Sequence, residues 1–296
     1  MLGQRILTAI VLFIVLGLVL AAPGLWPLPA LLGLAAVCAL WEWQRLVWPS
    51  SASRRVGPVL LALLVGITIA GLLWSMPNQG IIHPDYHFLH TLLNAFVALC
   101  MHGIVVSSAL FWVLGATTMV VRGNTQAAPG SFVLAAVGVL VTIAAWWSLF
   151  RLYIRFDAWL LVSLMAVVWV ADIGAYIAGK TLGKHKLAPK VSPGKSIEGA
   201  LGGVLAAVLW VWLSSYCWDG SFGEVMAKRW SWPLTLLLTA GLAAISIIGD
   251  LFESLLKRRA GVKDSSALLP GHGGVYDRID ALLPVSVLAW LLLGGL

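Results

Sequence analysis

The chain has 296 residues, of which 60% are hydrophobic and only 10% are charged, and its mean hydropathy is +0.96. Soluble globular proteins are typically about 45–50% apolar and about 25% charged, so this composition excludes a soluble domain built on one amphipathic core. The net charge of +7 fits either an anionic ligand or the Lys/Arg bias of cytoplasmic loops. The three cysteines show no C-x-x-C spacing, which argues against a disulfide framework or a cysteine metal site.

The apolar segments predict an all-α, polytopic integral membrane protein, because a membrane-spanning helix needs about 20 predominantly apolar residues. The first segment follows Arg5 and ends in Ala-Ala-Pro-Gly, which resembles a signal peptide, but the many later spans favour an uncleaved first helix. The apolar run 87–121 is overlong and fits either one tilted helix with an interfacial lead-in or two short helices. About nine spans are predicted, at residues 5–22, 27–43, 56–74, 92–121, 131–150, 157–179, 197–216, 232–256 and 281–296.

Charge asymmetry predicts the orientation of these spans. With the N-terminus in the cytoplasm, fifteen of the nineteen lysines and arginines fall in cytoplasmic segments, as the positive-inside rule favours. The two charged loops, 180–196 and 257–280, then face the cytoplasm together. Residues 1–150 contain only the acids Glu42 and Asp85 and are predicted to be transmembrane scaffold helices, whereas residues 151–296 are predicted to form the catalytic transmembrane region.

The first charged loop follows an acid inside an apolar segment. Asp172 lies four residues before Tyr176 on the same helix face, and an ionisable group within a membrane span predicts a functional site. Five lysines follow, which suit phosphate oxygens or, as the simpler alternative, an anionic lipid surface. The turn Ser192-Pro-Gly-Lys-Ser196 is expected to open the next helix and to point backbone N–H groups at an anion. A P-loop is rejected, because Pro189 replaces its first glycine and no strand is expected before it.

The second charged loop begins at the end of the 232–256 span. Asp250, Glu253, Ser254 and Lys257 are spaced to share one helix face, and two further acids, Asp277 and Asp280, are three residues apart. Carboxylates from two helices, without a His/Cys cluster, suit a hard cation such as Mg²⁺. His272 lies in Pro-Gly-His-Gly-Gly, where flexible backbone allows close approach to a ligand, and its role is left open between structure and binding or proton transfer.

These motifs resemble the signature of the phosphatidate cytidylyltransferase (CDP-diacylglycerol synthase) family. The resemblance lies in Ser254-x-x-Lys-Arg-x4-Lys-Asp-x-Ser-x-x-Leu-Pro-Gly-His-Gly-Gly-x-x-Asp-Arg-x-Asp280 and extends upstream through Gly-Lys-His-Lys-Leu-Ala-Pro-Lys-Val-Ser-Pro-Gly-Lys-Ser, Asp172 and Glu198. It is strong over residues 165–296, while residues 1–150 match in hydropathy and in Trp41-Glu42-Trp43. The chain departs from the family at Ser266, where glycine is frequent, and at Ile197, where an aromatic residue is common.

The resemblance implies the reaction of CTP with phosphatidate to give CDP-diacylglycerol and pyrophosphate, in the inner membrane of a bacterium with the active site facing the cytoplasm. It implies Mg²⁺, with a second cation such as K⁺ as an option, and a homodimer that acts on CTP and membrane lipid and binds no nucleic acid. The implied catalytic residues are Asp250, Asp277, Lys257, Arg258, Lys263 and His272. The implied metal ligands are Asp250, Asp277, Asp264 and Asp280. The implied substrate-binding residues are Asp172, Lys186, Ser192, Lys195, Ser196, Glu198, Ser254 and Arg278.

Two alternatives remain at this point. A CTP-dependent polyprenol kinase would need the same residue types but would transfer the γ-phosphate of CTP. A transporter or channel with an acidic midplane site would be expected to show internal repeats and mid-helix charges, whereas here the charges cluster at the predicted cytoplasmic edge and no repeat is visible.

Overall fold

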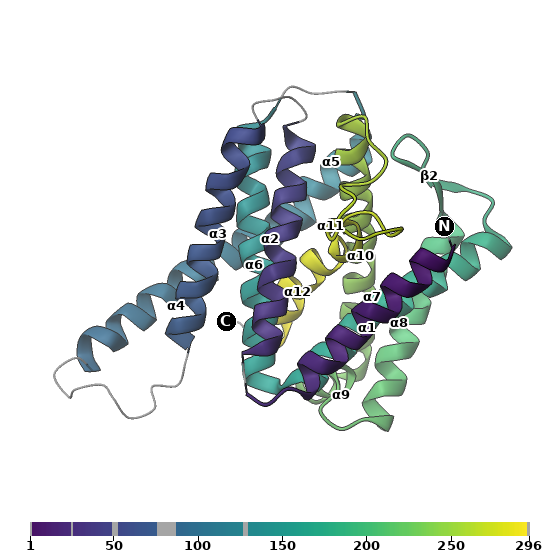
Figure 1. Cartoon of the computed structure of the whole chain (residues 1–296). Helices are drawn as coiled ribbons and strands as arrows, with labels where there is room; N and C mark the ends of the chain where they lie inside the picture. Colours follow the sequence, from purple (N-terminus) through teal and green to yellow (C-terminus); the bar gives the residue numbers. More distant parts are fainter. Residues whose placement is uncertain (1, 25, 49–52, 76–86, 127–129, 295–296) are drawn as a thin grey trace.

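The computed structural model is a helical bundle with one short hairpin (Figure 1). It describes residues 2–24, 26–48, 53–75, 87–126 and 130–294. The elements are α1 (Leu2–Ala21), α2 (Pro27–Val47), α3 (Ser53–Ser75), α4 (His87–Leu110), the π-helical turn η2 (Phe111–Ala116), α5 (Thr117–Arg122), α6 (Phe132–Phe156), α7 (Ala158–Leu182), β1 (Lys186–Ala188), β2 (Ser192–Ser196), α8 (Ile197–Cys217), α9 (Phe222–Arg229), α10 (Trp232–Arg259), α11 (Tyr276–Ile279) and α12 (Leu282–Leu292).

Six helices in the described part of the chain are long and apolar enough to cross a membrane, and they support the predicted all-α membrane protein. They are Pro27–Val47, Ala95–Arg122, Phe132–Phe156, Ala158–Leu182, Ile197–Cys217 and Trp232–Arg259. The other three predicted spans correspond to shorter apolar stretches, Ile10–Ala21, Val59–Thr68 and Leu282–Leu292. The count of nine spans stays a prediction. Residues 49–52, between the predicted spans 27–43 and 56–74, lie outside the described residues.

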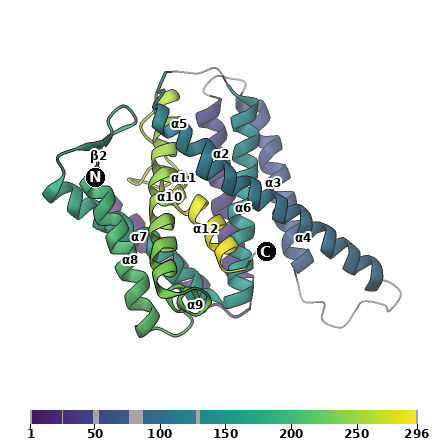
Figure 2. The same cartoon turned by 180° about the vertical axis from the view of Figure 1, so that it is seen from behind.

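The overlong apolar run forms one continuous helix from residue 87 to residue 122, interrupted only by the π-helical turn η2. Within this turn, two consecutive residues reach the same partner: the rings of Phe111 and Trp112 lie 5.5 and 5.6 Å from the ring of Phe252 in α10. Consecutive residues of a regular α-helix point about 100° apart, so the widened turn is what lets both rings pack on one side chain. In the reverse view this helix runs obliquely across the near side of the bundle, in front of α6 (Figure 2).

The aromatic core connects the first half of the chain to the second. Trp43 of α2 is fully buried and packs on Phe252 of α10 at 5.3 Å and on Tyr276 of α11 at 5.5 Å between ring centroids. Trp112 completes this cluster at 6.5 Å from Trp43. Rings of this size bury large apolar areas, so the cluster fixes α2, α10 and α11 relative to one another.

Helices α7 and α8 pack closely through small residues. A Cβ atom added to Gly203 would lie 2.7 Å from the backbone oxygen of Ala171, and one added to Gly199 would lie 2.9 Å from the oxygen of Ala175. Gly199 and Gly203 are spaced as in a G-x-x-x-G motif, which lets membrane helices approach closely. The close packing brings the acid-bearing end of α7 against the start of α8, where the lysine-rich loop ends.

The two charged loops lie toward the same end of the bundle, as predicted (Figure 1). The expectation that no strand precedes Ser192 is wrong: β1 and β2 form an antiparallel hairpin that pairs Lys186 with Ser196 and Ala188 with Ser192. The hairpin forms because Ala188 and Val191 close a tight turn, with the N–H of Val191 donating to the oxygen of Ala188 at 3.1 Å. An antiparallel hairpin differs from the strand-loop-helix unit of a P-loop, so the rejection of that motif is unaffected.

Candidate active site

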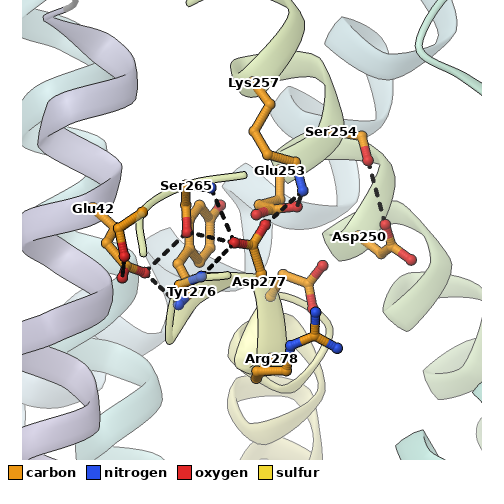
Figure 3. Close-up of polar contacts among 12 residues, drawn as sticks. Glu42, Asp250, Glu253, Ser254, Lys257, Ser265, Tyr276, Asp277 and Arg278 are labelled. Carbon is orange, nitrogen blue, oxygen red and sulfur yellow. Dashed lines mark hydrogen bonds and ion pairs between the residues drawn. The ribbon is translucent and has the colours of Figure 1, made fainter. Parts of the chain in front are cut away.

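The polar face predicted on α10 is present. Asp250, Glu253, Ser254 and Lys257 follow one another on this helix at the end where the charged loops lie (Figure 3). Ser254 donates a long hydrogen bond of 3.5 Å to Asp250, and Lys257 pairs with Glu253 at 2.6 Å. Three basic residues close the helix, where they interact favourably with its dipole. The helix therefore brings two acids, a hydroxyl and a base to one surface.

Three carboxylates converge beside this face. Ligand oxygens of Asp250, Glu253 and Asp280 all lie within 4.8 Å of one another, and we call these residues the carboxylate group. Glu253 is buried, and its Oε1 has no hydrogen-bond partner among the described residues. An unpaired buried oxygen beside two further carboxylates is costly unless a cation is present, so the donor set fits a hard divalent ion.

Asp277 and Asp264, two of the predicted metal ligands, lie outside the carboxylate group. The single turn α11 directs Asp277 toward Lys257, whose Nζ donates to it at 2.7 Å. Its other oxygen accepts hydrogen bonds from the N–H of Gly274 at 2.7 Å and from the N–H and hydroxyl of Ser265 at 3.0 and 2.8 Å. Asp264 is exposed. Metal coordination by either residue stays a prediction, and Glu253 takes a place in the cluster that the prediction gave to Asp277.

The hydrogen bonds of Asp277 also determine its ionisation. Burial alone would raise the pKa of Asp277, but hydrogen bonds with the side chains of Glu253 and Lys257 and with the N–H of Gly274 outweigh it and hold the pKa well below its usual range. A carboxyl with a depressed folded-state pKa stabilises the fold above its ordinary pKa, and this stabilisation is lost only as the pH falls below that value. Asp277 therefore stays ionised near neutral pH and holds the loop through that charge.

An ion pair joins the first charged loop to α10. Lys195, in β2, lies 2.5 Å from Asp250 of α10. The predicted helix-opening turn is instead the strand β2, and only Ser196 serves the helix directly, because its hydroxyl accepts a hydrogen bond from the N–H of Gly199 as the N-cap of α8. Because β2 is extended, Lys195 lies beside Asp250 of α10.

A cavity of about 380 Å³ opens beside this ion pair. Its walls come from α7, the hairpin, α8 and α10. Asp172, Tyr176 and Lys180 of α7 face Lys195 and Asp250 across it. The predicted shared face of Asp172 and Tyr176 is therefore present and lines a cavity, and small apolar residues of α7 and α8 complete the walls.

Three predicted substrate-binding or catalytic residues hold the loops in place. Glu198 accepts hydrogen bonds from the N–H groups of Lys184 and His185 and from the ring of His185. Arg258 donates to the backbone oxygen of Val191, and Arg278 donates twice to the oxygen of His272. Substrate contacts by these residues stay predictions. The remaining predicted residues lie on the loops or strands: Lys186, Ser192, Lys263 and His272.

Comparison with known proteins identifies the family of this chain. A profile of the Cytidylyltransferase family matches residues 3–295. The chain belongs to this family. A Pseudomonas aeruginosa protein named phosphatidate cytidylyltransferase is 37% identical over 302 residues, covering 98% of this chain and 97% of that protein. A Haemophilus influenzae protein of the same name is 34% identical over 302 residues, covering 95% of each chain. A Brucella suis protein of that name is 47% identical over 131 residues, covering 44% of this chain and 45% of that protein.

The match to the cytidylyltransferase family includes α1 to α6, where the sequence predicted only scaffold. One functional candidate there was missed: Glu42 of α2 is buried and accepts hydrogen bonds from the loop that carries Asp277. The sequence does set Glu42 apart, because acids are rare in this half of the chain. Glu42 is one of two acids in the first 150 residues and lies inside an apolar segment, where an ionisable residue indicates a functional site. The division of the chain at residue 150 stays a prediction.

Proposed function

We propose that this protein transfers the cytidylyl group of CTP to phosphatidate. A phosphate oxygen of phosphatidate forms a bond to the α-phosphorus of CTP, the bond from that phosphorus to the β-phosphate oxygen breaks, and pyrophosphate leaves with the electron pair. The observation that carries the proposal is the family match over residues 3–295 together with full-length relatives named phosphatidate cytidylyltransferase. The cavity beside a cationic and carboxylate cluster supports it.

The nucleophile of this reaction is already an anion, so the protein's main tasks are to align two anions and to offset their repulsion. Lys195 and Lys180 line the cavity and are the cations best placed to meet phosphate there. Lys195 is paired with Asp250, so a phosphate oxygen would compete with that carboxylate for the ammonium group. Lys257 is held between Glu253 and Asp277, where its role is to neutralise them.

The carboxylate group is the proposed site of Mg²⁺. The unpaired Oε1 of Glu253 and the convergence of Asp250 and Asp280 support this assignment. When bound, Mg²⁺ would neutralise phosphate charge and orient the triphosphate of CTP. The proposal also includes a second cation such as K⁺ and the other predicted metal ligands, Asp264 and Asp277. The sequence alone supports these parts.

Phosphatidate is proposed to enter sideways from the membrane. Helices α7 and α8, which wall the cavity, present exposed apolar side chains on their outer surfaces, among them Ile173, Ile177, Leu201 and Leu205. Apolar exposure of this kind on spans of 25 and 21 residues suits contact with acyl chains. The phosphate would then reach Lys195 while the chains stay in lipid.

We further propose that the N-terminus, both charged loops and the cavity face the cytoplasm of a bacterial inner membrane. The positive-inside count supports this orientation. The hydroxyl of Thr8 in α1 donates to the oxygen of Pro270 at 2.8 Å, which supports a common side for the start of α1 and the second charged loop. The proposed homodimer rests on the resemblance stated above.

The reaction is tested with purified protein, phosphatidate and CTP labelled at either the α- or the γ-phosphorus. We expect α-label in the lipid product and γ-label in pyrophosphate, because the bond between the α- and β-phosphates breaks. Transfer of γ-label to a lipid would contradict the proposal and indicate a kinase. Mass spectrometry of the lipid fraction identifies CDP-diacylglycerol independently of the label.

Asp172 provides a test of the cavity. We expect Asp172→Asn to lower kcat/KM for CDP-diacylglycerol formation by about 10- to 100-fold, because Asp172 lines the cavity and a charge that orients a cation or a substrate there contributes more than a neutral hydrogen bond. Initial rates at varied CTP and phosphatidate measure it. Asp219→Asn is the matched control, since Asp219 is an exposed acid between α8 and α9. A full rate in Asp172→Asn would make Asp172 a structural residue.

A further inference from the structure

Glu42 is a buried acid in the first half of the chain, remote in sequence from every residue in the proposed reaction. Its side chain leaves the middle of the apolar helix α2 and points at the loop before α11 (Figure 3). Four donor groups surround the carboxylate, two hydroxyls and two backbone N–H groups, and the hydroxyl of Ser265 shares its single proton between Glu42 and Asp277. The donors are Ser265 Oγ at 3.1 Å, Ser266 Oγ at 2.5 Å, Val275 N at 3.0 Å and Tyr276 N at 2.5 Å.

These donors come from both ends of one loop. Ser265 and Ser266 lie at its start, and Val275 and Tyr276 lie where it runs into α11. The loop closes tightly around the carboxylate, because a Cβ atom added to Gly274 would lie 2.6 Å from the Glu42 carboxylate and 2.0 Å from the Ser265 hydroxyl. Glu42 therefore fixes the two ends of the loop to each other and to α2.

A short chain of contacts leads from Glu42 to the proposed reaction centre. The hydroxyl of Ser265 lies 2.8 Å from Asp277, and Asp277 lies 2.7 Å from Lys257. Lys257 in turn pairs with Glu253, a member of the carboxylate group. Glu42 is not among the residues that line the cavity. Any effect of Glu42 on the reaction must therefore pass through the residues that it holds.

We infer that Glu42 is a positioning residue for the proposed cytidylyl transfer: it aligns Asp277 and Lys257 by holding residues 265–276. The inference rests on the proposed function. A carboxylate is required because a backbone N–H donates to each of its two oxygens, and an ionised carboxylate offers only acceptors. Glutamine has the same shape, but its NH₂ group would face either Val275 N or Tyr276 N, and that N–H would lose its acceptor.

The first test compares Glu42→Gln with Gln44→Ala. Gln44 is a matched control, because it is buried in the same helix and donates to the oxygen of Ala135 in α6, away from the loop. We expect kcat of Glu42→Gln to fall about 10- to 100-fold, the usual effect of removing a partner that orients catalytic ligands, with KM for CTP and phosphatidate changed by less than about threefold. Gln44→Ala should lower the thermal midpoint while keeping kcat of the folded protein within about twofold.

The second test is a double-mutant cycle on kcat. If Glu42 acts through Ser265, the combination of Glu42→Gln and Ser265→Ala should lose little more activity than the more severe single variant. Gln44→Ala combined with Ser265→Ala should instead give the product of the two single effects. Multiplicative effects for Glu42 and Ser265, or an equal kcat loss in Gln44→Ala at a matched thermal midpoint, would overturn the inference.

Two further measurements apply if Glu42→Gln does not fold or if the unaltered protein is inactive. If Glu42→Gln does not fold, Ser266→Ala removes a single donor to the same carboxylate and should lower kcat by about fivefold. A kcat within about twofold of the original protein in both Ser266→Ala and Ser265→Ala would overturn the inference in that case. Failure of the proposed function is distinguishable, because the unaltered protein would then form no CDP-diacylglycerol from CTP and phosphatidate.

Discussion

Replacing Asp250 with asparagine should lower the rate of CDP-diacylglycerol formation by about 10³-fold, because the proposed Mg²⁺ would contribute several kcal/mol of electrostatic stabilisation and would depend on this carboxylate. Asp250 is the one residue that belongs both to the carboxylate group and to the cavity wall. The same variant should lose most of its Mg²⁺ affinity, measured directly by calorimetry on the purified protein. Rates at saturating CTP and phosphatidate over a range of Mg²⁺ concentrations give the activity.

Two variants separate the metal role of Asp250 from its ion pair. Lys195→Met removes the partner at 2.5 Å and should lower activity while keeping Mg²⁺ affinity. Asp219→Asn, on the exposed turn between α8 and α9, should change neither quantity. The metal assignment would be wrong if Asp250→Asn bound Mg²⁺ like the unaltered protein, or if Lys195→Met lost the ion as fully as Asp250→Asn.

Lys257→Met should destabilise the protein by about 3–5 kcal/mol and abolish most activity, because removing one member of a buried charge cluster leaves the others uncompensated. Lys257 lies 2.6 Å from Glu253 and 2.7 Å from Asp277, whose side chains are 1% and 5% exposed. Thermal unfolding in detergent measures the stability. Adding Glu253→Gln should recover part of that stability, since it removes one stranded charge, but should leave the protein inactive.

Lys228 provides the matched control for Lys257. Both lysines pair with a glutamate four residues earlier on a helix, at 2.5 Å for Lys228 and 2.6 Å for Lys257, but the lysine side chains are 72% and 15% exposed. Water replaces the lost partner at the exposed pair, so Lys228→Met should leave the unfolding midpoint nearly unchanged. An equal loss of stability in the two variants would mean that burial is not what makes the Lys257 cluster important.

The sequence predicted the parts of the site that depend on regular helical spacing. The shared face of Asp250, Glu253, Ser254 and Lys257 needs only the 3.6-residue period of a long apolar helix, and the structure has it. Asp172 and Tyr176 line a common cavity wall for the same reason. The meeting of the two charged loops at one end followed from the even number of spans between them.

The arrangements that the sequence did not predict depend on irregular backbone or on tertiary packing. Asp277 and Asp280 are three residues apart, but α11 is a single turn, and its side chains serve different partners: Asp277 meets Lys257 and Ser265, while Asp280 meets Asp250 and Glu253. The hairpin β1–β2 was missed because strands of three and five residues give almost no period-two signal. No local pattern could place Glu42 beside Tyr276, because that contact is made by tertiary packing alone.

The hydrogen bonds of Glu42 also constrain how the protein is made. Their donors lie 223 to 234 residues further along the chain, so a ribosome delivers α2 to the bilayer long before residues 265–276 exist. An unpaired carboxylate within the bilayer is unfavourable in free energy. Glu42 therefore lacks these hydrogen-bond donors until residues 265–276 have been synthesised. Completion of the loop therefore acts as a closing step in biogenesis, and fragments that end before residue 265 retain an acid with nothing to bind it.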